Sequence, residues 1–453
     1  MKNWTTDSWK SFKAFQQPEY SDPEKYGKVL GTICAYPALV FPGEVVKLKE
    51  QIAKAGERKA FILQGGSCAE KFIDCNEASI TNQIKILLQM SVILTYGARK
   101  SIIKIGRIAG QYAKPRSNVT EIVDGQLISS YLGDSVNDYT PNLAARTPDP
   151  ERLLQSYHHS AATLNYIRAM IDGGFADLHH PYNWNLHSIE KSPKWPDYQK
   201  IVAQILDAID FMESFGGARK ESLNKVDFFT SHEGLLLGYE EAMTRKDPQS
   251  QKYYNLGAHM VWIGERSRDV NGAHVEYFRG ISNPIGMKVG PTCTADELLK
   301  LLSILNPDNE PGKITLITRM GASKVDDILP GLVKAVQKSG NVVTWCCDPM
   351  HGNTIIGNGK LKTRNFSVIL DELKRSFLIH IENQSYLAGV HFELTGEDVS
   401  ECIGGSVNLT DEELQRNYSS YCDPRLNYSQ SLEMAFLITQ LLHENYSSFR
   451  SLS

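Results

Sequence analysis

Four residues with metal-binding side chains are scattered along this sequence: Cys68, His351, Glu393 and Asp423. A thiolate, an imidazole and two carboxylates together combine soft and hard donors. Magnesium sites seldom use Cys or His, and structural zinc sites seldom use two carboxylates. The donor set therefore indicates a catalytic manganese, cobalt, iron or zinc ion with an open coordination position. The alternative is that Cys68 is a small buried apolar side chain, the usual role of a free cysteine.

A second set of residues is positively charged. Arginine binds phosphates and carboxylates through a planar fork of two hydrogen bonds, so a cluster of such side chains predicts anionic ligands. Two phosphorylated substrates, or one phosphate and one carboxylate, would suit it. Any single member could instead be a surface charge or a salt-bridge partner. The set comprises Arg107, Lys114, Arg116, Arg266, Lys288 and Arg319.

Most of these residues directly follow short apolar runs. Near-continuous apolar runs are typical of strands that are buried on both faces of a parallel sheet. The runs comprise residues 60–64, 101–105, 226–230, 259–263, 283–289, 314–318, 342–346 and 386–392. Eight such units, separated by helical segments, favour an α/β fold with a closed (β/α)8 TIM barrel over an open sheet. In a barrel the carboxyl ends of the strands converge on one face, which is where active sites form.

The segments between the runs carry helix signals. Residues 82–96, 151–171 and 196–215 are predicted helices, the last two within one long connection between the second and third strands. Thr294 and Thr410 each precede a glutamate by three positions and fit the capping box at a helix start. Two His-His pairs, at 158–159 and 179–180, are interpreted as helix-surface and loop residues, because no thiol or carboxylate accompanies them in a metal-binding pattern.

The expected organisation is an N-terminal extension, residues 1–55, packed on a barrel domain of residues 56–453. A helical segment at about 175–222 is inserted between the second and third strands. The chain of 453 residues has a net charge of −4, which gives no general attraction to nucleic acid. No apolar run is long enough to span a membrane, and no signal peptide is evident, so a cytoplasmic protein is expected. Walker, dinucleotide-binding and nucleophile-elbow motifs are absent from the sequence, which argues against those enzyme classes.

The motifs around the reactive residues run through nearly the whole chain in a fixed order. They are Leu-Gln-Gly-Gly-Ser-Cys-Ala-Glu (63–70), Arg-Ile-Ala-Gly-Gln-Tyr-Ala-Lys-Pro-Arg-Ser (107–117), Thr-Ser-His-Glu (230–233), Trp-Ile-Gly-Glu-Arg (262–266), Asn-Pro-Ile-Gly-Met-Lys-Val-Gly-Pro (283–291), Thr-Arg-Met-Gly (318–321), Cys-Asp-Pro-Met-His-Gly-Asn-Thr (347–354), Gly-Val-His-Phe-Glu (389–393) and Cys-Asp-Pro-Arg-Leu-Asn (422–427). Together they resemble the type II 3-deoxy-D-arabino-heptulosonate 7-phosphate (DAHP) synthases, which condense phosphoenolpyruvate with erythrose 4-phosphate at the start of the shikimate pathway.

The resemblance implies a role for each residue. The metal ligands are Cys68, His351, Glu393 and Asp423, with manganese or cobalt as the ion and zinc, iron or magnesium as alternatives. Phosphoenolpyruvate maps onto Arg107, Glu265, Arg266, Lys288 and Arg319. Erythrose 4-phosphate maps onto Lys114, Pro115, Arg116 and Ser117, with Asp348 near the reacting end. Lys288, Asp348 and His351 are the expected catalytic residues.

The resemblance also implies regulation and assembly. The long connection between strands two and three resembles that of members inhibited by aromatic amino acids. The family forms homodimers or homotetramers, and chorismate mutase is a further candidate partner. Because Cys422 adjoins Asp423, oxidation could join its sulfur to that of Cys68; two reduced thiols are the alternative in a reducing compartment.

Three other functions stay open from the sequence. A specialised relative would use the same barrel and metal but accept an imino sugar phosphate, which a substrate panel would detect. A non-catalytic scaffold protein should have lost metal ligands or cations, and all are present here. A metal-dependent aldolase for other sugar phosphates would explain the barrel and the cations, but not the full series of motifs.

Overall fold

Eight parallel strands close into a barrel, in the order β1, β14, β11, β10, β9, β8, β5, β2. The computed structural model describes residues 3–175, 193–216 and 226–450. The barrel strands are Ala60–Gly66 (β1), Ser101–Arg107 (β2), Phe228–Glu233 (β5), Met260–Ile263 (β8), Ile285–Val289 (β9), Ile314–Thr318 (β10), Thr344–Cys347 (β11) and Leu387–Glu393 (β14). Each predicted run forms one of these strands, so the (β/α)8 fold is confirmed.

The amino-terminal half of the barrel is filled with apolar side chains and closed by a helix. Ile62, Ile103 and Ile317 belong to this floor and are almost fully buried. Helix α2 (Pro42–Gly56) lies against β1, β11 and β14 and adds Leu48 and Ile52 to the same cluster. Because this end is sealed by packing, polar chemistry is confined to the opposite, carboxyl end of the strands.

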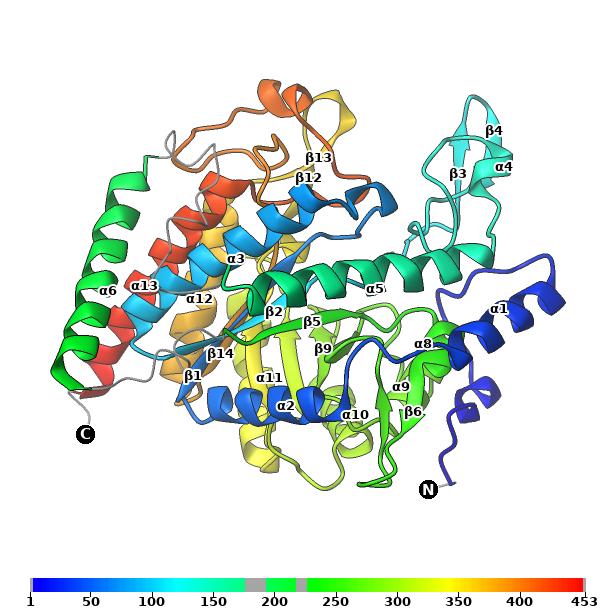
Figure 1. Cartoon of the computed structure of the whole chain (residues 1–453), viewed down its shortest axis with the longest axis horizontal. Coiled ribbons are helices and arrows are strands. Elements are labelled where there is room, and N and C mark those ends of the chain that lie inside the picture. The colour runs from blue at the N-terminus through cyan, green and yellow to red at the C-terminus, as the bar shows by residue number, and fades with distance from the viewer. Residues whose placement is uncertain (1–2, 176–192, 217–225, 451–453) are drawn as a thin grey trace.

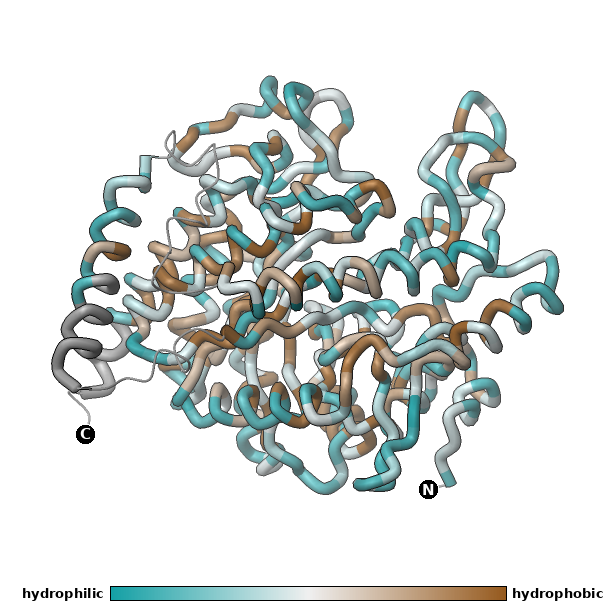
Figure 2. Tube along the Cα trace, viewed as in Figure 1, coloured by the Kyte–Doolittle hydropathy of each residue, from teal (hydrophilic) through white to brown (hydrophobic). Residues whose placement is uncertain are grey.

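Helices surround the barrel (Figure 1). They are α3 (Glu77–Ala98), α5 (Glu151–Asp172), α6 (Trp195–Gly216), α8 (Leu237–Met243), α9 (Ala273–Phe278), α10 (Ala295–Leu305), α11 (Val325–Ser339), α12 (Phe366–Glu382) and α13 (Tyr428–Arg450). The three predicted helices correspond to α3, α5 and α6. Helix α3 is apolar on nearly all sides because α5, α6 and α13 cover it. Figure 2 shows hydrophobic residues gathered around the strands and along α3 and α13.

The two capping boxes have different outcomes. Thr294 caps α10 as predicted, and its hydroxyl accepts a hydrogen bond from the Glu297 amide at 3.2 Å. At Thr410 the helix prediction is wrong, because only a short 3-10 helix forms there, at Glu412–Arg416, and Asp411 is its N-cap. The Thr410 amide does donate to the Glu413 carboxylate at 2.9 Å. One of the two hydrogen bonds of the capping box therefore forms, and it stabilises a short 3-10 turn that does not continue as an α-helix.

The N-terminal residues pack along one side and the floor of the barrel. A 3-10 helix at Ser8–Ser11 contacts α9, and α1 (Pro23–Ala35) contacts α5 and α8. About half of the predicted insertion at about 175–222 lies outside the described residues, and its described part consists mainly of α6. The domain boundaries therefore stay a prediction.

Three hairpins extend from the barrel. They are β3–β4 (Thr120–Val123, Gln126–Ser129), β6–β7 (Thr244–Lys246, Tyr253–Asn255) and β12–β13 (Thr354–Ile356, Lys362–Arg364). With α4 (Leu143–Arg146), β3–β4 forms a lobe that stands away from the barrel at the upper right of Figure 1. A search of the described residues finds no helix of the length and apolarity that a membrane span requires.

Candidate metal and substrate site

The predicted site residues meet at the carboxyl end of the barrel. Strand β1 leads to Cys68, β2 to Arg107, β11 to His351, and β14 ends at Glu393. Gly66 is in register with both Arg107 and Glu393, so three neighbouring strands end at one level. Asp423 comes from the segment before α13. Residues more than 350 positions apart thereby share one small volume.

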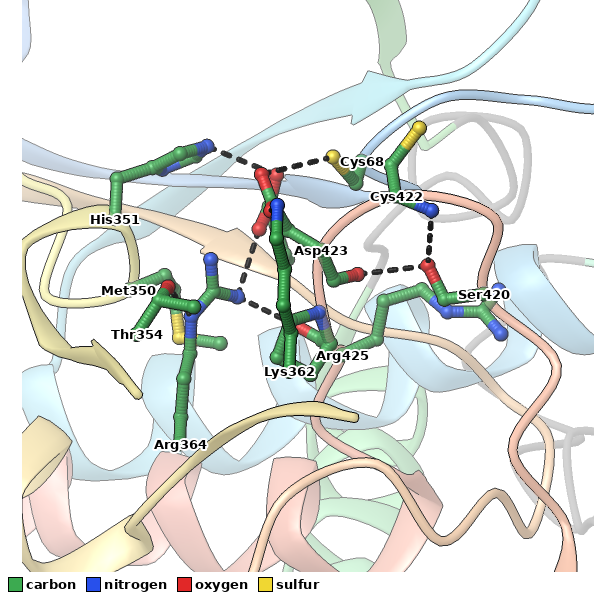
Figure 3. A network of polar contacts seen from close by, with 12 residues as sticks. Cys68, Met350, His351, Thr354, Lys362, Arg364, Ser420, Cys422, Asp423 and Arg425 are labelled. Atoms are coloured by element: carbon green, nitrogen blue, oxygen red, sulfur yellow. Dashed lines mark hydrogen bonds and ion pairs between the residues drawn. The ribbon is translucent and has the colours of Figure 1, made fainter. Parts of the chain in front are cut away.

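Three of the four predicted metal ligands converge. Donor atoms of Cys68, Glu393 and Asp423 all lie within 4.8 Å of one another. The fourth, His351, places Nε2 3.0 Å from a Glu393 oxygen. Figure 3 shows the side chains of His351, Cys68 and Asp423 directed toward one another. This thiol, imidazole and carboxylate set fits a divalent ion with soft and hard preferences.

The ammonium group of Lys114 lies among the predicted metal ligands. Lys114 Nζ is 2.6 Å from Cys68 Sγ and 2.6 Å from Asp423 Oδ2. Burial raises the pKa of Asp423, but Lys114 and other cations outweigh it and hold that pKa well below its usual range. The cluster is therefore anionic and gathers positive charge, which is the property that a metal site requires.

Glu393 is fully buried and is held by cations on several sides. Arg364 lies 2.7 Å from one carboxylate oxygen, and Arg107 lies 3.2 Å from the other. Burial raises the pKa of Glu393, but His351 and Arg364 more than offset this and keep it well below the usual range. The carboxylate is therefore ionised, as a metal ligand must be.

Asp348 lies behind the site and joins two of its members. Its Oδ2 accepts hydrogen bonds from His351 Nδ1, at 2.7 Å, and from Lys288 Nζ. A carboxylate on Nδ1 leaves Nε2 of the imidazole free to bind a metal. Burial lowers the pKa of Lys288 to about 8, although Asp348 acts in the opposite direction.

One cavity of about 200 Å³ is lined in part by three of the predicted metal ligands, Cys68, His351 and Asp423. Trp262 forms part of its wall and contacts cations: the Arg107 guanidinium lies 5.3 Å and Lys288 Nζ 5.9 Å from the ring centroid. All five residues mapped onto phosphoenolpyruvate line it, namely Arg107, Glu265, Arg266, Lys288 and Arg319.

A second cavity of about 310 Å³ adjoins the first. The four residues mapped onto erythrose 4-phosphate line it, namely Lys114, Pro115, Arg116 and Ser117. Arg266 lines both cavities and donates a hydrogen bond to Ser117 Oγ at 2.8 Å. Asp348 lines neither, since its carboxylate faces Lys288 and His351.

Sequence reasoning missed several residues of the site. Glu233 lines the first cavity with a buried, unpaired oxygen, and burial raises its pKa. Its place after a predicted strand was the available signal. Lys362, 2.8 Å from Asp423, and Arg364 come from β13. That hairpin has no pattern that marks it as part of a site.

The histidine and cysteine interpretations can also be compared with the structure. His158 is exposed on α5 and His159 stacks on Phe72, so the first pair is confirmed as helix-surface residues. The pair at 179–180 lies outside the described residues. Both Cys68 and Cys422 are free thiols, and a hydrogen bond joins them.

Comparison with known proteins agrees with this geometry. The model of the class-II DAHP synthetase family matches residues 4–439. The chain belongs to the class-II DAHP synthetase family. A phospho-2-dehydro-3-deoxyheptonate aldolase from Neurospora crassa is 47% identical, with 96% of this chain and 93% of that protein covered. One from Streptomyces coelicolor is 46% identical, with 97% of both covered.

The fold itself rests on the strand order. A truncated DAHP synthase from Thermotoga maritima aligns over 87% of this chain and 88% of its own, at 11% identity and a TM-score of 0.33. The closed ring of eight parallel strands establishes the barrel without it.

Proposed function

We propose that this protein condenses phosphoenolpyruvate with erythrose 4-phosphate and water to give 3-deoxy-D-arabino-heptulosonate 7-phosphate and phosphate. One observation carries the proposal: a buried cluster of metal-ligand residues adjoins two cation-lined cavities at the carboxyl end of the barrel. One cavity suits a small anion with a phosphate and a carboxylate, and the other suits a longer sugar phosphate. Membership of the DAHP synthetase family supports the same reaction.

The proposed metal ligands are Cys68, His351, Glu393 and Asp423. These side chains would hold a divalent ion, which would supply Lewis-acid polarisation of the aldehyde oxygen. Manganese or cobalt suits this mixture of donors, and zinc, iron and magnesium are the alternatives.

Arg107, Arg266 and Arg319 bind the phosphate and carboxylate of phosphoenolpyruvate, and so fix its C3 toward the second cavity. C3 bonds to the aldehyde carbon with the π electrons of its C2=C3 bond, which leaves positive charge at C2. The π electrons of the aldehyde C=O bond move to its oxygen, which then takes a proton. Water adds to C2 and loses a proton, which leaves a hydroxyl group there. The C–O bond to phosphate then breaks as this hydroxyl loses its own proton, so C2 becomes a ketone and phosphate leaves. Lys288, with its pKa lowered to about 8, is placed to hold or deliver one of these protons, and Asp348 orients it.

The second cavity is proposed to hold erythrose 4-phosphate. Lys114 and Arg116 would bind its phosphate or hydroxyl groups, while Pro115 and Ser117 shape the entrance. Arg266, shared between the cavities, would couple the two substrates.

Regulation and assembly are proposed from the same resemblance. The long connection between β2 and β5, with α5 and α6, is retained in this chain. It supports feedback inhibition by aromatic amino acids. We further propose that the protein forms a homodimer or homotetramer in the cytoplasm. Chorismate mutase is the proposed partner protein.

The decisive experiment follows phosphoenolpyruvate consumption by the purified protein with erythrose 4-phosphate. It is run with chelator, after addition of manganese or cobalt, and then with each aromatic amino acid. Chelator-sensitive consumption with release of phosphate and the seven-carbon product supports the reaction and its metal. No consumption with any metal, but turnover of an imino sugar phosphate, would replace this proposal with the specialised one.

A further inference from the structure

A carboxylate outside the cavities holds the loop that follows β10. Glu372 on α12 is 1% exposed. Its Oε1 accepts hydrogen bonds from the backbone amides of Met320, at 2.8 Å, and Gly321, at 2.9 Å. Met320 directly follows Arg319, which lines the first cavity. The loop is therefore anchored one residue beyond a substrate-binding side chain.

Asn353 connects this anchor to the loop that follows β11. Its Nδ2 donates to Glu372 Oε2 at 2.6 Å and to the Pro349 carbonyl at 2.8 Å. Its Oδ1 accepts from the Ala322 amide at 3.0 Å. Glu372 and Asn353 thus bind three consecutive amides of one loop and a carbonyl of the other.

The two loops touch at this point. Gly321 has a φ of +86°, and a Cβ there would lie 2.9 Å from the Gly352 carbonyl oxygen. A Cβ on Gly352 would in turn overlap the Gly321 nitrogen. Arg319 also donates to the His351 carbonyl at 3.2 Å. The separation between Arg319 and His351 is therefore set by backbone contact and by two buried side chains.

We propose that Glu372 and Asn353 are positioning residues, which hold the anion-binding Arg319 and the metal-binding His351 at the separation that the reaction needs. The proposal rests on the roles given to Arg319 and His351 above. Neither positioning residue lines the two substrate cavities, so each acts only through the loops. The direction of each hydrogen bond is fixed by the chemistry of the two side chains. The Glu372 carboxylate accepts all of its hydrogen bonds, whereas the Asn353 amide donates to Glu372 and accepts from the Ala322 amide.

The test exchanges these donor and acceptor roles. In E372Q the new side-chain NH2 group faces either the Asn353 amide or the backbone amides of Met320 and Gly321, donor against donor in both orientations. In N353D two carboxylates face each other. The double variant E372Q/N353D restores the hydrogen bond between the two side chains in the reverse direction, because an amide at position 372 then donates to a carboxylate at position 353. The bond from position 353 to the Pro349 carbonyl stays lost in N353D and in the double variant. The control is S376A, one turn further along α12, where Ser376 is also 1% exposed and contacts the Cys347 thiol at 3.4 Å.

Each single variant should raise the KM for phosphoenolpyruvate and the Kd for Mn²⁺, measured by chelator competition, by about tenfold. The KM for erythrose 4-phosphate should change less than about twofold. The double variant should recover part of both losses, because the bond between the two side chains returns while the bond to the Pro349 carbonyl does not. S376A should lower the melting temperature while both constants stay at the wild-type value.

Two results would overturn the proposal: single variants with normal KM and Kd, or a double variant whose losses simply multiply. If E372Q does not fold, N353D and N353S carry the same measurements. Failure of the proposed function looks different, because the wild-type protein would then consume no phosphoenolpyruvate while its Mn²⁺ affinity could still be compared with that of the variants.

Discussion

At the scale of single residues, the site depends on how a buried carboxylate is kept charged. Glu393 is fully buried, yet Arg107, Arg364 and His351 surround it and hold its pKa low. A buried charge without such partners would be very unfavourable. Glu393, a proposed metal ligand, is therefore ionised in the absence of a metal ion.

Replacing Arg319 by Ala should raise the KM for phosphoenolpyruvate roughly 10- to 100-fold and lower kcat, because a charged hydrogen-bonding group is lost from the cavity. Steady-state kinetics with both substrates measures this. R375A is the matched control, since Arg375 is exposed on α12 and pairs with Asp326 and Asp371. Unchanged kinetics in R319A would remove Arg319 from the binding site.

Replacing Asp348 by Asn should weaken Mn²⁺ binding roughly 10- to 100-fold, because the carboxylate that orients the His351 ring is lost. Asp348 accepts from His351 Nδ1 at 2.7 Å. The dissociation constant is measured by competition with a chelator, with D326N as an exposed control. Equal affinities in D348N and the wild-type protein would show that His351 needs no such partner.

At the scale of elements, the barrel separates stability from chemistry. Helix α2 seals the amino end with apolar residues, whereas the predicted site residues lie at the carboxyl ends of the strands and in the loops that follow. Helices also reach the site from outside, as α12 does through Glu372. Elements that contact the floor should therefore affect folding, and elements that contact the loops should affect binding.

Replacing Ile52 by Ala should lower the free energy of unfolding by about 2–4 kcal/mol, because a fully buried side chain in the barrel floor is truncated. The KM values should not change. Denaturant unfolding and kinetics on the same preparation test both parts. K54A, at an exposed position of α2, should leave both unchanged. A changed KM in I52A would show that the floor and the site are coupled.

At the scale of the whole molecule, burial of neutral histidines makes stability depend on pH. His274 Nε2 donates to the Leu235 carbonyl at 2.9 Å, and His380 Nδ1 lies 2.9 Å from the Ser385 hydroxyl. Burial lowers the pKa of His274 to about 4 and that of His380 to about 3. The ordinary value in an unfolded chain is about 6.5.

Stability should therefore fall as pH drops below about 6.5, because the unfolded chain binds protons that the folded protein does not. At pH 5.5 each of these histidines should lower the free energy of unfolding by about 1.4 kcal/mol relative to neutral pH. Urea unfolding at about pH 7.5 and about pH 5.5, in chelator, measures the difference. H380Q removes one titrating group, so its free energy of unfolding should change less between the two pH values, by the contribution of one histidine. If the free energy of unfolding changes equally with pH in H380Q and in the wild-type protein, protonation of His380 is not a cause of the pH dependence.

Much of this molecule follows from local sequence. The eight strands are predictable because a strand that is buried on both faces has a nearly continuous run of apolar residues in its sequence. The proposed metal-binding and substrate-binding residues are predictable as a group, because parallel strands in a barrel place the residues after their carboxyl ends on one face. Residue chemistry then indicates which of these side chains suit a metal and which suit an anion.

Other features depend on tertiary structure alone. The β3–β4 hairpin is mostly exposed, and Ile128 is the one residue of its two strands that is buried, so little burial imposes a pattern on its sequence. The helix expected at Thr410 is only a 3-10 turn. In the sequence Arg364 looks like an ordinary cation of a hairpin, and only the fold places it against Glu393. In the sequence Glu372 looks like an acidic residue on a helix surface, and only the fold brings two loop amides to its carboxylate. Their partners lie far away along the chain, so only folding brings those groups together.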